Sequence, residues 1–182
     1  MVYSVLWEGF SVSVKGVGRV RDFIEKHGVR AEILEFSGTV ESVSAASNAS
    51  GFPPSRILKT LLVIAGKRPY VVILPGDRRL DFKKLSRELN VKNVRLAKPS
   101  EVKELLNVKP GEVSPFLDEV LKYDVIVDES VMDRGEVLVG GGSMHHLVRV
   151  HVDEVVRVLT VSYTHLRAHE TRHDLVCRLL LE

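Results

Sequence analysis

The stretch 57-ILKTLLVIAGKRPYVVIL-74 decides how the fold is interpreted. Two apolar runs, residues 60–65 and 70–74, flank a link over residues 66–69 that contains a glycine and a proline. A short link of this kind between two apolar runs is typical of a β-hairpin. Both runs are apolar at nearly every position, so we expect the hairpin to be buried on both faces within a larger sheet.

On both sides of this hairpin, short helix and strand patterns follow one another without a regular βαβ order. Helical patterns begin near Gly18 and Val152 and cover residues 41–49, 81–89 and 99–106. Strand patterns cover residues 31–36, 94–97, 125–127, 136–139 and 147–150. The sequence therefore predicts an α+β fold, with a mixed, largely antiparallel sheet curled toward a barrel and short surrounding helices.

The composition of the chain is that of a folded globular protein and argues against several other classes of protein. The 182 residues suit one domain, and 45% hydrophobic residues are enough to form a packed core, which excludes disorder as the main state. A net charge of +2 is too small for a histone-like protein that binds nucleic acid through a large excess of basic residues. It is compatible with a protein that binds one short stretch of RNA through a few basic side chains. No apolar run approaches the ~20 residues of a membrane span, and no secretory signal precedes the body. We expect a cytoplasmic protein that binds neither DNA nor a membrane.

The two ends of the chain differ from the body. We interpret residues 1–16 as an N-terminal extension, 17–159 as the functional domain, and 160–182 as a non-native tail that resembles translated adapter or vector sequence. The tail carries His165, His169 and His173 at a helical spacing that can hold zinc. A zinc-dependent hydrolase is thus one hypothesis, although we expect no metal and no cofactor.

Three features of the body are candidates for chemistry. Lys59 interrupts an apolar stretch, so its side chain either reaches solvent at an edge or points into a cleft. The loop from Gly111 to Pro115 can direct backbone N–H groups at a carbonyl or phosphate oxygen. The glycines at 140–142 form either a wide turn or a place where a ligand approaches the backbone, and His146 follows them closely.

A nucleophile paired with a base is not evident from the pattern. The body contains no cysteine, and neither Ser114 nor Ser143 has the G-x-S-x-G context of a serine hydrolase. His145 and His146 are adjacent, so in a strand they would point to opposite faces.

The order of these motifs resembles the prolyl-tRNA editing domain family, also called the YbaK domain, over about residues 17–159. The series runs through a small-residue helix at 43–46, the Lys59 stretch, residues 72–81, residues 94–97, the Gly111 to Pro115 loop, residues 127–130 and the glycines at 140–142. Lys59 falls on the lysine of the family pattern, and Gly111 falls on the first glycine of its Gly-x-x-x-Pro loop.

The resemblance implies an aminoacyl-tRNA deacylase that hydrolyses the ester of mischarged tRNA in trans, with alanyl- or cysteinyl-tRNA for proline as the substrate. Its implied partners are the 3′ acceptor end of the tRNA and prolyl-tRNA synthetase, and it needs no cofactor. The alternative is a non-catalytic module of the same fold that binds tRNA ends or a synthetase. The implied catalytic residues are Lys59 and Gly111, and the implied substrate-binding residues are Pro115, Gly141, Gly142 and His146.

Overall fold

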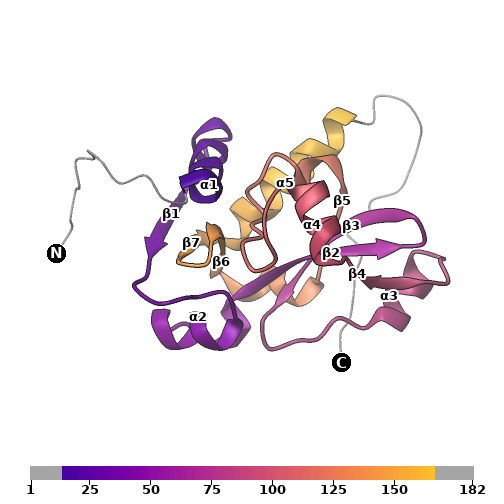
Figure 1. Ribbon diagram of the computed structural model, residues 1–182, viewed down its shortest axis with the longest axis horizontal. Helices are drawn as coiled ribbons and strands as arrows, with labels where there is room; N and C mark the ends of the chain where they lie inside the picture. The colour runs from indigo at the N-terminus through magenta and orange to yellow at the C-terminus, as the bar shows by residue number, and fades with distance from the viewer. Residues whose placement is uncertain (1–13, 167–182) are drawn as a thin grey trace.

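The computed structural model describes residues 14–166, which form helices packed around two sheets (Figure 1). The predicted α+β class is confirmed. The helices are α1 (Val14–Lys26), α2 (Val43–Ser50), α3 (Phe82–Glu88), α4 (Pro99–Leu106) and α5 (Val152–Leu166), with short 3₁₀ turns η1 (Pro54–Arg56), η2 (Val120–Lys122) and η3 (Glu129–Arg134). The strands are β1 (Ala31–Glu35), β2 (Leu58–Ala65), β3 (Arg68–Pro75), β4 (Val94–Leu96), β5 (Asp124–Val127), β6 (Glu136–Ser143) and β7 (His146–His151).

The predicted hairpin is strands β2 and β3, and it forms the centre of a four-stranded sheet of order β4-β2-β3-β5. The two strands pair antiparallel over their whole length, with Lys59 opposite Leu74, whereas β5 lies parallel to β3. Residues 71–74 are fully buried, as the apolar pattern predicts. This strand pair is therefore the rigid element on which the rest of the sheet is built.

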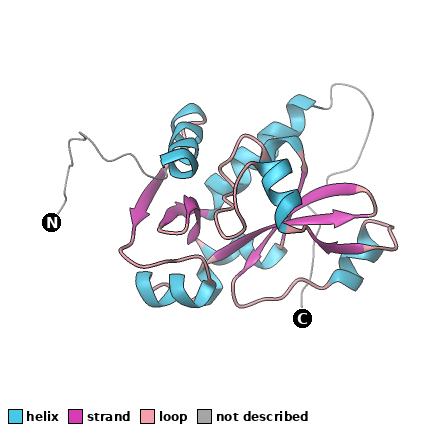
Figure 2. Cartoon of the chain, in the orientation of Figure 1, coloured by secondary structure: helices cyan, strands magenta, loops and turns pink. Residues whose placement is uncertain are grey.

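The second sheet is three-stranded, with the order β1-β7-β6 and antiparallel pairing throughout (Figure 2). It meets the first sheet at one parallel bridge between Ile57 and Leu138. The largest core cluster includes residues of both sheets together with Phe23 of α1 and Val155 of α5. The two sheets are joined in this way but are not closed into a barrel.

Strand β4 covers only part of the outer edge of β2. Its three residues pair with Val63 to Ala65, and one more hydrogen bond runs from Ala97 N–H to the Leu62 carbonyl. The bridge at Ile57 covers the other end of the same edge. Between these two points, no strand among the described residues pairs with that edge of β2.

Several elements differ in extent from the sequence prediction. Strand β2 begins at Leu58, before the expected apolar run at residues 60–65, so that Lys59 lies within the strand. Strand β6 continues through the glycines at 140–142, with an irregular register between Gly140 and Ser143, where a loop was expected. Helix α1 begins at Val14, and α5 continues to Leu166 beyond the expected domain boundary.

The two terminal segments are mostly outside the described residues, which begin at 14 and end at 166. His169 and His173 lie outside this range, as does the side chain of His165. The interpretation of residues 160–182 as a non-native tail therefore stays a prediction. Within the described part of the chain, no helix has both the length and the apolar character needed to cross a membrane.

A buried carboxylate fixes α5 to the chain between α1 and β1. Glu154 is 5% exposed, and its two oxygens accept hydrogen bonds from Arg157 at 2.6 Å and from the Arg30 side chain at 3.0 and 3.1 Å. The Arg30 backbone N–H also donates to Glu154, at 3.3 Å. The hydrogen bonds from Arg157, followed by those from Arg30, lower the pKa of the Glu154 carboxyl to about 2.

We expect Glu154→Gln to lower the melting temperature by about 3–6 °C at pH 7, because two arginines lose their anionic partner. The pKa of Glu154 is lower in the folded chain than the usual 4.5, so its contribution is complete above about pH 5 and is lost as the pH falls toward 2. The melting temperatures of the two proteins should therefore converge over that range in a thermal denaturation series. A difference that persists unchanged at pH 2 would contradict this account.

The matched control is Glu32→Gln. Glu32 pairs with Arg149 on the surface, and the Glu32 side chain is 55% exposed. Exposed ion pairs contribute little to stability, so this variant should melt within about 1 °C of the wild type at every pH.

Candidate active site

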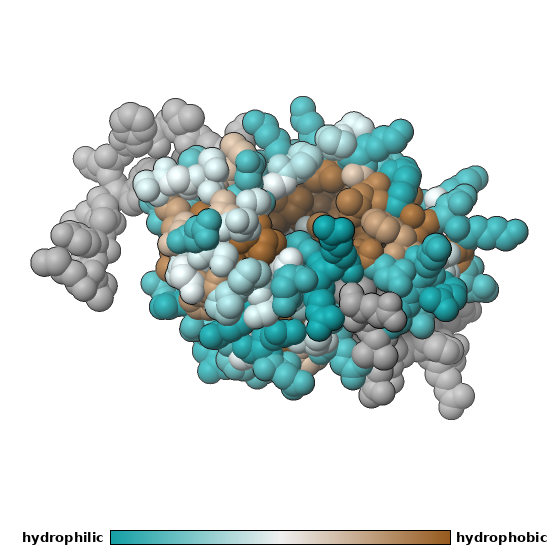
Figure 3. Space-filling view, turned by 90° about the horizontal axis from the view of Figure 1, so that it is seen from below, coloured by the Kyte–Doolittle hydropathy of each residue, from teal (hydrophilic) through white to brown (hydrophobic). Residues whose placement is uncertain are grey.

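A cavity of about 370 Å³ lies beside the part of the β2 edge that β4 leaves uncovered. On the face of the molecule seen in Figure 3, hydrophobic residues form the floor of a hollow that hydrophilic residues surround. The lining of the cavity is mainly apolar and comes from β2, α2, α4, the Gly111 loop and the β6–β7 hairpin. Its polar side chains are those of Glu41, Ser42, Lys59, Thr60, Ser143 and His146.

The Gly111 loop forms one wall of the cavity, and its position depends on Gly140. A methyl group added at Gly140 would lie 2.2 Å from the Val113 carbonyl oxygen, so β6 and the loop touch backbone to backbone. Gly111 has a φ of +89°, a conformation that residues with a side chain rarely adopt. The two glycine motifs that the sequence singled out are thus in direct contact, and both line the cavity.

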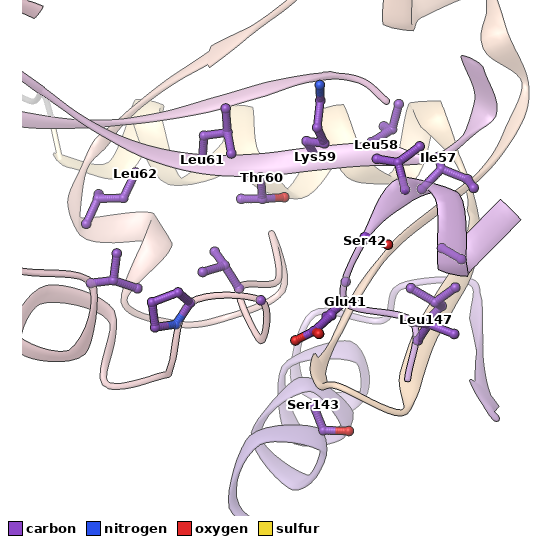
Figure 4. Close-up of a pocket in the computed structure, with 18 of the residues that line it drawn as sticks. Glu41, Ser42, Ile57, Leu58, Lys59, Thr60, Leu61, Leu62, Ser143 and Leu147 are labelled. Carbon is purple, nitrogen blue, oxygen red and sulfur yellow. The ribbon is translucent and has the colours of Figure 1, made fainter. Parts of the chain in front are cut away.

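Lys59 contributes to the cavity wall, but its head group lies on the other side of β2. Figure 4 shows the Lys59 side chain pointing to the face of the strand opposite Thr60. Its Nζ donates a hydrogen bond to the Arg78 carbonyl in the loop after β3. Burial lowers the pKa of the Lys59 ammonium, and the nearby Asp77 carboxylate opposes this shift. The head group therefore lies on the face of β2 opposite Thr60, beside the loop after β3.

Ser143 and His146 form a hydrogen-bonded pair at the end of the β6–β7 hairpin. Ser143 Oγ lies 2.7 Å from His146 Nδ1 and accepts a hydrogen bond from the His145 N–H at 3.1 Å. Burial lowers the pKa of the His146 imidazole, although the Glu35 carboxylate opposes the shift at 4.0 Å. His146 is therefore a neutral imidazole at neutral pH, and it can accept a proton or a hydrogen bond in the cavity wall.

Three of the residues predicted for the site are placed elsewhere. Pro115 is buried behind the loop and does not line the cavity. Gly141 packs on the backbone of His146, and Gly142 packs on Gly16 of α1. The structure brings together Lys59, Gly111 and His146 as lining residues, while Pro115, Gly141 and Gly142 support the wall from outside.

Two polar residues of the cavity were missed by sequence reasoning. Glu41 lies beside the loop, so that a methyl group added at Gly111 would be 3.6 Å from Glu41 Oε2. Thr60 is 9% exposed, and its Oγ1 is buried without a hydrogen-bond partner among the described residues. Ser42, by contrast, caps α2 by accepting a hydrogen bond from Ala45 N–H. The position of Thr60 directly after Lys59 in a strand was the available signal, because neighbouring strand residues face opposite ways.

No cluster of three or more metal-ligating side chains occurs among the residues that the structure describes. The polar groups of the cavity lining are one carboxylate, hydroxyls and one imidazole, while the Lys59 ammonium lies on the other face of β2. This set suits the binding of a small polar molecule.

Comparison with known proteins identifies the family. A family model described as the aminoacyl-tRNA editing domain matches residues 38–158. A proline–tRNA ligase of Aquifex aeolicus (strain VF5) is 38% identical over 94 residues, which are 50% of this chain and 16% of the ligase. The chain therefore spans less than a fifth of the length of that ligase.

Solved structures share the whole fold. The hypothetical protein APE2540 has 30% sequence identity and a TM-score of 0.70, with 76% of this chain and 92% of that chain covered. A candidate trans-editing enzyme for prolyl tRNA synthetase has 26% identity and a TM-score of 0.74, with 82% and 94% covered. In both cases nearly all of the other chain is matched, in contrast to the ligase.

We expect Gly140→Ala to displace the Gly111 loop, because the added methyl cannot fit 2.2 Å from the Val113 carbonyl oxygen. The melting temperature should fall by about 3–8 °C, and amide hydrogen exchange should accelerate over residues 109–115. The matched control is Gly38→Ala, since a methyl at Gly38 meets no atom within 4 Å. Unchanged exchange of the loop in Gly140→Ala would show that Gly140 does not position it.

Proposed function

The chain belongs to the aminoacyl-tRNA editing domain family, and we propose that it is a deacylase that hydrolyses the ester bond of mischarged tRNA. The observation that carries this proposal is the cavity beside β2, in which a glycine of positive φ lies next to the Glu41 carboxylate and which Thr60 also lines. An aminoacyl ester presents a carbonyl, an ammonium and a side chain within a few bonds of one another. The cavity lining contains the Gly111 loop for the carbonyl, the Glu41 carboxylate for the ammonium, and a mainly apolar wall for the side chain.

The chemistry asks little of the protein. An aminoacyl ester is already activated, so hydrolysis needs a positioned water and a stabilised oxyanion more than a protein nucleophile. We assign the carbonyl to the backbone N–H groups of the Gly111 loop. By resemblance to the family, the 2′-hydroxyl of the terminal ribose helps to activate the water, and the neutral imidazole of His146 forms part of the substrate-binding wall.

Lys59 is proposed to contact a phosphate at the 3′ end of the tRNA and not the ester itself. Its ammonium lies on the face of β2 opposite the cavity interior (Figure 4), where it donates a hydrogen bond to the Arg78 carbonyl. Asp77 and Arg79 are close enough to influence its charge. A compact ammonium at this position suits a phosphate that stays outside while the aminoacyl group enters.

The finer points of the function follow from the resemblance. We propose alanyl- or cysteinyl-tRNA for proline as the substrate, action in trans, and prolyl-tRNA synthetase as a partner in the cytoplasm. The relation to proline–tRNA ligases and to a candidate trans-editing enzyme supports these assignments. The role is one of translation fidelity, in which a small cavity admits residues that the synthetase wrongly attaches.

The decisive experiment is a single-turnover deacylation assay against proline tRNA charged with alanine, cysteine or proline. We expect hydrolysis of a mischarged species, and a loss of about 10²-fold in rate for Gly111→Val, because a β-branched residue cannot adopt the φ of +89°. Gly38→Val is the matched control, since its side chain would extend into open space. Tight binding of the charged tRNA without hydrolysis would support the alternative, a non-catalytic module.

Glu41 is the residue that we assign to the α-ammonium of the substrate. The ammonium is attached to the carbon next to the ester carbonyl, so a carbonyl held by the Gly111 loop places it close to the Glu41 carboxylate. No ion pair with another described residue involves Glu41, and its side chain is exposed at the mouth of the cavity. A free carboxylate there favours a cationic group.

We expect Glu41→Gln to raise KM about threefold to tenfold with little change in kcat, since an exposed carboxylate contributes modestly to binding. N-acetylation of the aminoacyl group removes the positive charge of the substrate. It should weaken substrate binding to the wild type by a similar factor, and it should not change substrate binding to the Glu41→Gln variant. Equal sensitivity of both proteins to N-acetylation would exclude Glu41 as the ammonium site.

A further inference from the structure

Thr60 carries a polar group that the folded chain itself does not use. Its Oγ1 is buried and has no hydrogen-bond partner among the described residues. Two other hydroxyls of the described chain are paired: the buried Ser114 Oγ accepts from Phe116 N–H at 3.1 Å, and the half-buried Ser47 Oγ donates to the Phe52 carbonyl at 2.7 Å. An unpaired buried hydroxyl costs stability, so its presence requires an explanation.

Two other buried polar atoms of the described chain lack a hydrogen-bond partner, but each has a polar interaction close by. Asp128 Oδ2 is unpaired, but the other oxygen of the same carboxylate accepts from the Ser130 N–H and hydroxyl. His27 Nε2 lies 3.7 Å from an oxygen of Asp118. The Thr60 side chain has a single polar atom and no comparable neighbour.

The Thr60 side chain lies on the cavity side of β2. Figure 4 shows Thr60 on the face of β2 that is turned toward the space holding Glu41, while Lys59 points the other way. The flanking residues on that face, Leu58 and Leu62, are buried and apolar. Thr60 is therefore a polar residue in an apolar part of the lining, and its Oγ1 is covered from solvent in the free protein.

The backbone N–H and C=O of Thr60 are directed to the edge of β2 beside the cavity. The Leu62 carbonyl accepts from Ala97 N–H at the outer edge of β2, and backbone groups alternate between the two edges of a strand. The N–H and C=O of Thr60 therefore point to the outer edge, in the part that β4 leaves uncovered.

We propose that Thr60 is a specificity-determining residue, whose hydroxyl turns toward the cavity by rotation of the side chain about χ1 and hydrogen-bonds the γ-atom of a small polar side chain on the substrate. This rests on the proposed deacylase function. A hydroxyl or thiol at the γ position satisfies Thr60, whereas the methyl group of alanine leaves it unpaired. The chain then prefers seryl or cysteinyl esters over alanyl esters of the same tRNA.

The test uses one tRNA charged with serine, cysteine or alanine, and compares the wild type with Thr60→Val and Thr60→Ser. The wild type should hydrolyse the seryl and cysteinyl esters about threefold to tenfold faster, in kcat/KM, than the alanyl ester. Thr60→Val should lose this preference while it still hydrolyses the alanyl ester. Thr60→Ser keeps the hydroxyl and should keep the preference.

Thermal unfolding of the free protein gives a second measurement. Thr60→Val should lose the substrate preference but gain stability. Thr60→Val removes an unpaired buried hydroxyl and keeps the shape of the side chain, so its melting temperature should rise by about 2–6 °C. Thr39→Val is the matched control, because Thr39 is exposed and does not line the cavity. It should change neither the melting temperature nor the preference.

Each contrary result has a distinct meaning. A more stable Thr60→Val protein with an unchanged preference overturns the proposal and leaves the deacylase function standing. A less stable Thr60→Val protein shows that the hydroxyl is already paired in the free protein, which removes the premise. A wild type that hydrolyses none of the mischarged esters overturns the proposed function, and the role of Thr60 falls with it.

Discussion

The site depends on a difference between the two edges of strand β2, of which one is fully hydrogen-bonded to a neighbouring strand and the other only in part. Its inner edge pairs with β3 over eight residues, which makes the strand rigid and buried. Its outer edge pairs with β4 only from Val63 onward and meets β6 only at Ile57. A short partner strand thus leaves an opening in an otherwise firm sheet, and the cavity occupies it. The polar groups that face this opening belong to a strand that has little freedom to move, so they are held ready for a substrate without a large cost in ordering.

Contact between two glycine-containing segments completes the cavity wall. Gly140 in β6 lets the Val113 carbonyl approach the strand, and this contact fixes the loop in which Gly111 takes its positive φ. Gly142, two residues farther along, carries the same strand against Gly16 of α1. One glycine run therefore packs on both the Gly111 loop and the first helix. A change in the packing of α1 is expected to reach the loop through a single strand, although the two segments are far apart in sequence.

The elements with strong local patterns were predictable from sequence, and the site was predictable only in part. The β2–β3 hairpin, the cap of α3 at Asp81 and the end of α4 at Leu106 follow from apolar runs and capping residues, and the structure confirms them. The continuation of β6 through its glycines was missed, because these glycines serve contacts with Val113 and Gly16 that no local pattern reveals. Lys59 stood out as a charge in an apolar stretch, whereas Thr60 did not. A threonine in a strand is ordinary, and its place after Lys59 indicates only that the two side chains face opposite ways, not that the hydroxyl of Thr60 lacks a hydrogen-bond partner.

The recessed edge of β2 also bears on how the protein behaves at high concentration. A strand with unpaired backbone groups at its edge is a template for pairing with another chain, which leads to edge-to-edge association. Here the exposed backbone lies at the bottom of a cavity flanked by α2, α4 and the Gly111 loop, so an extended strand from a second molecule has no room to lie alongside it. The walls of the cavity thus keep this uncovered part of β2 from pairing with a strand of another copy of the chain.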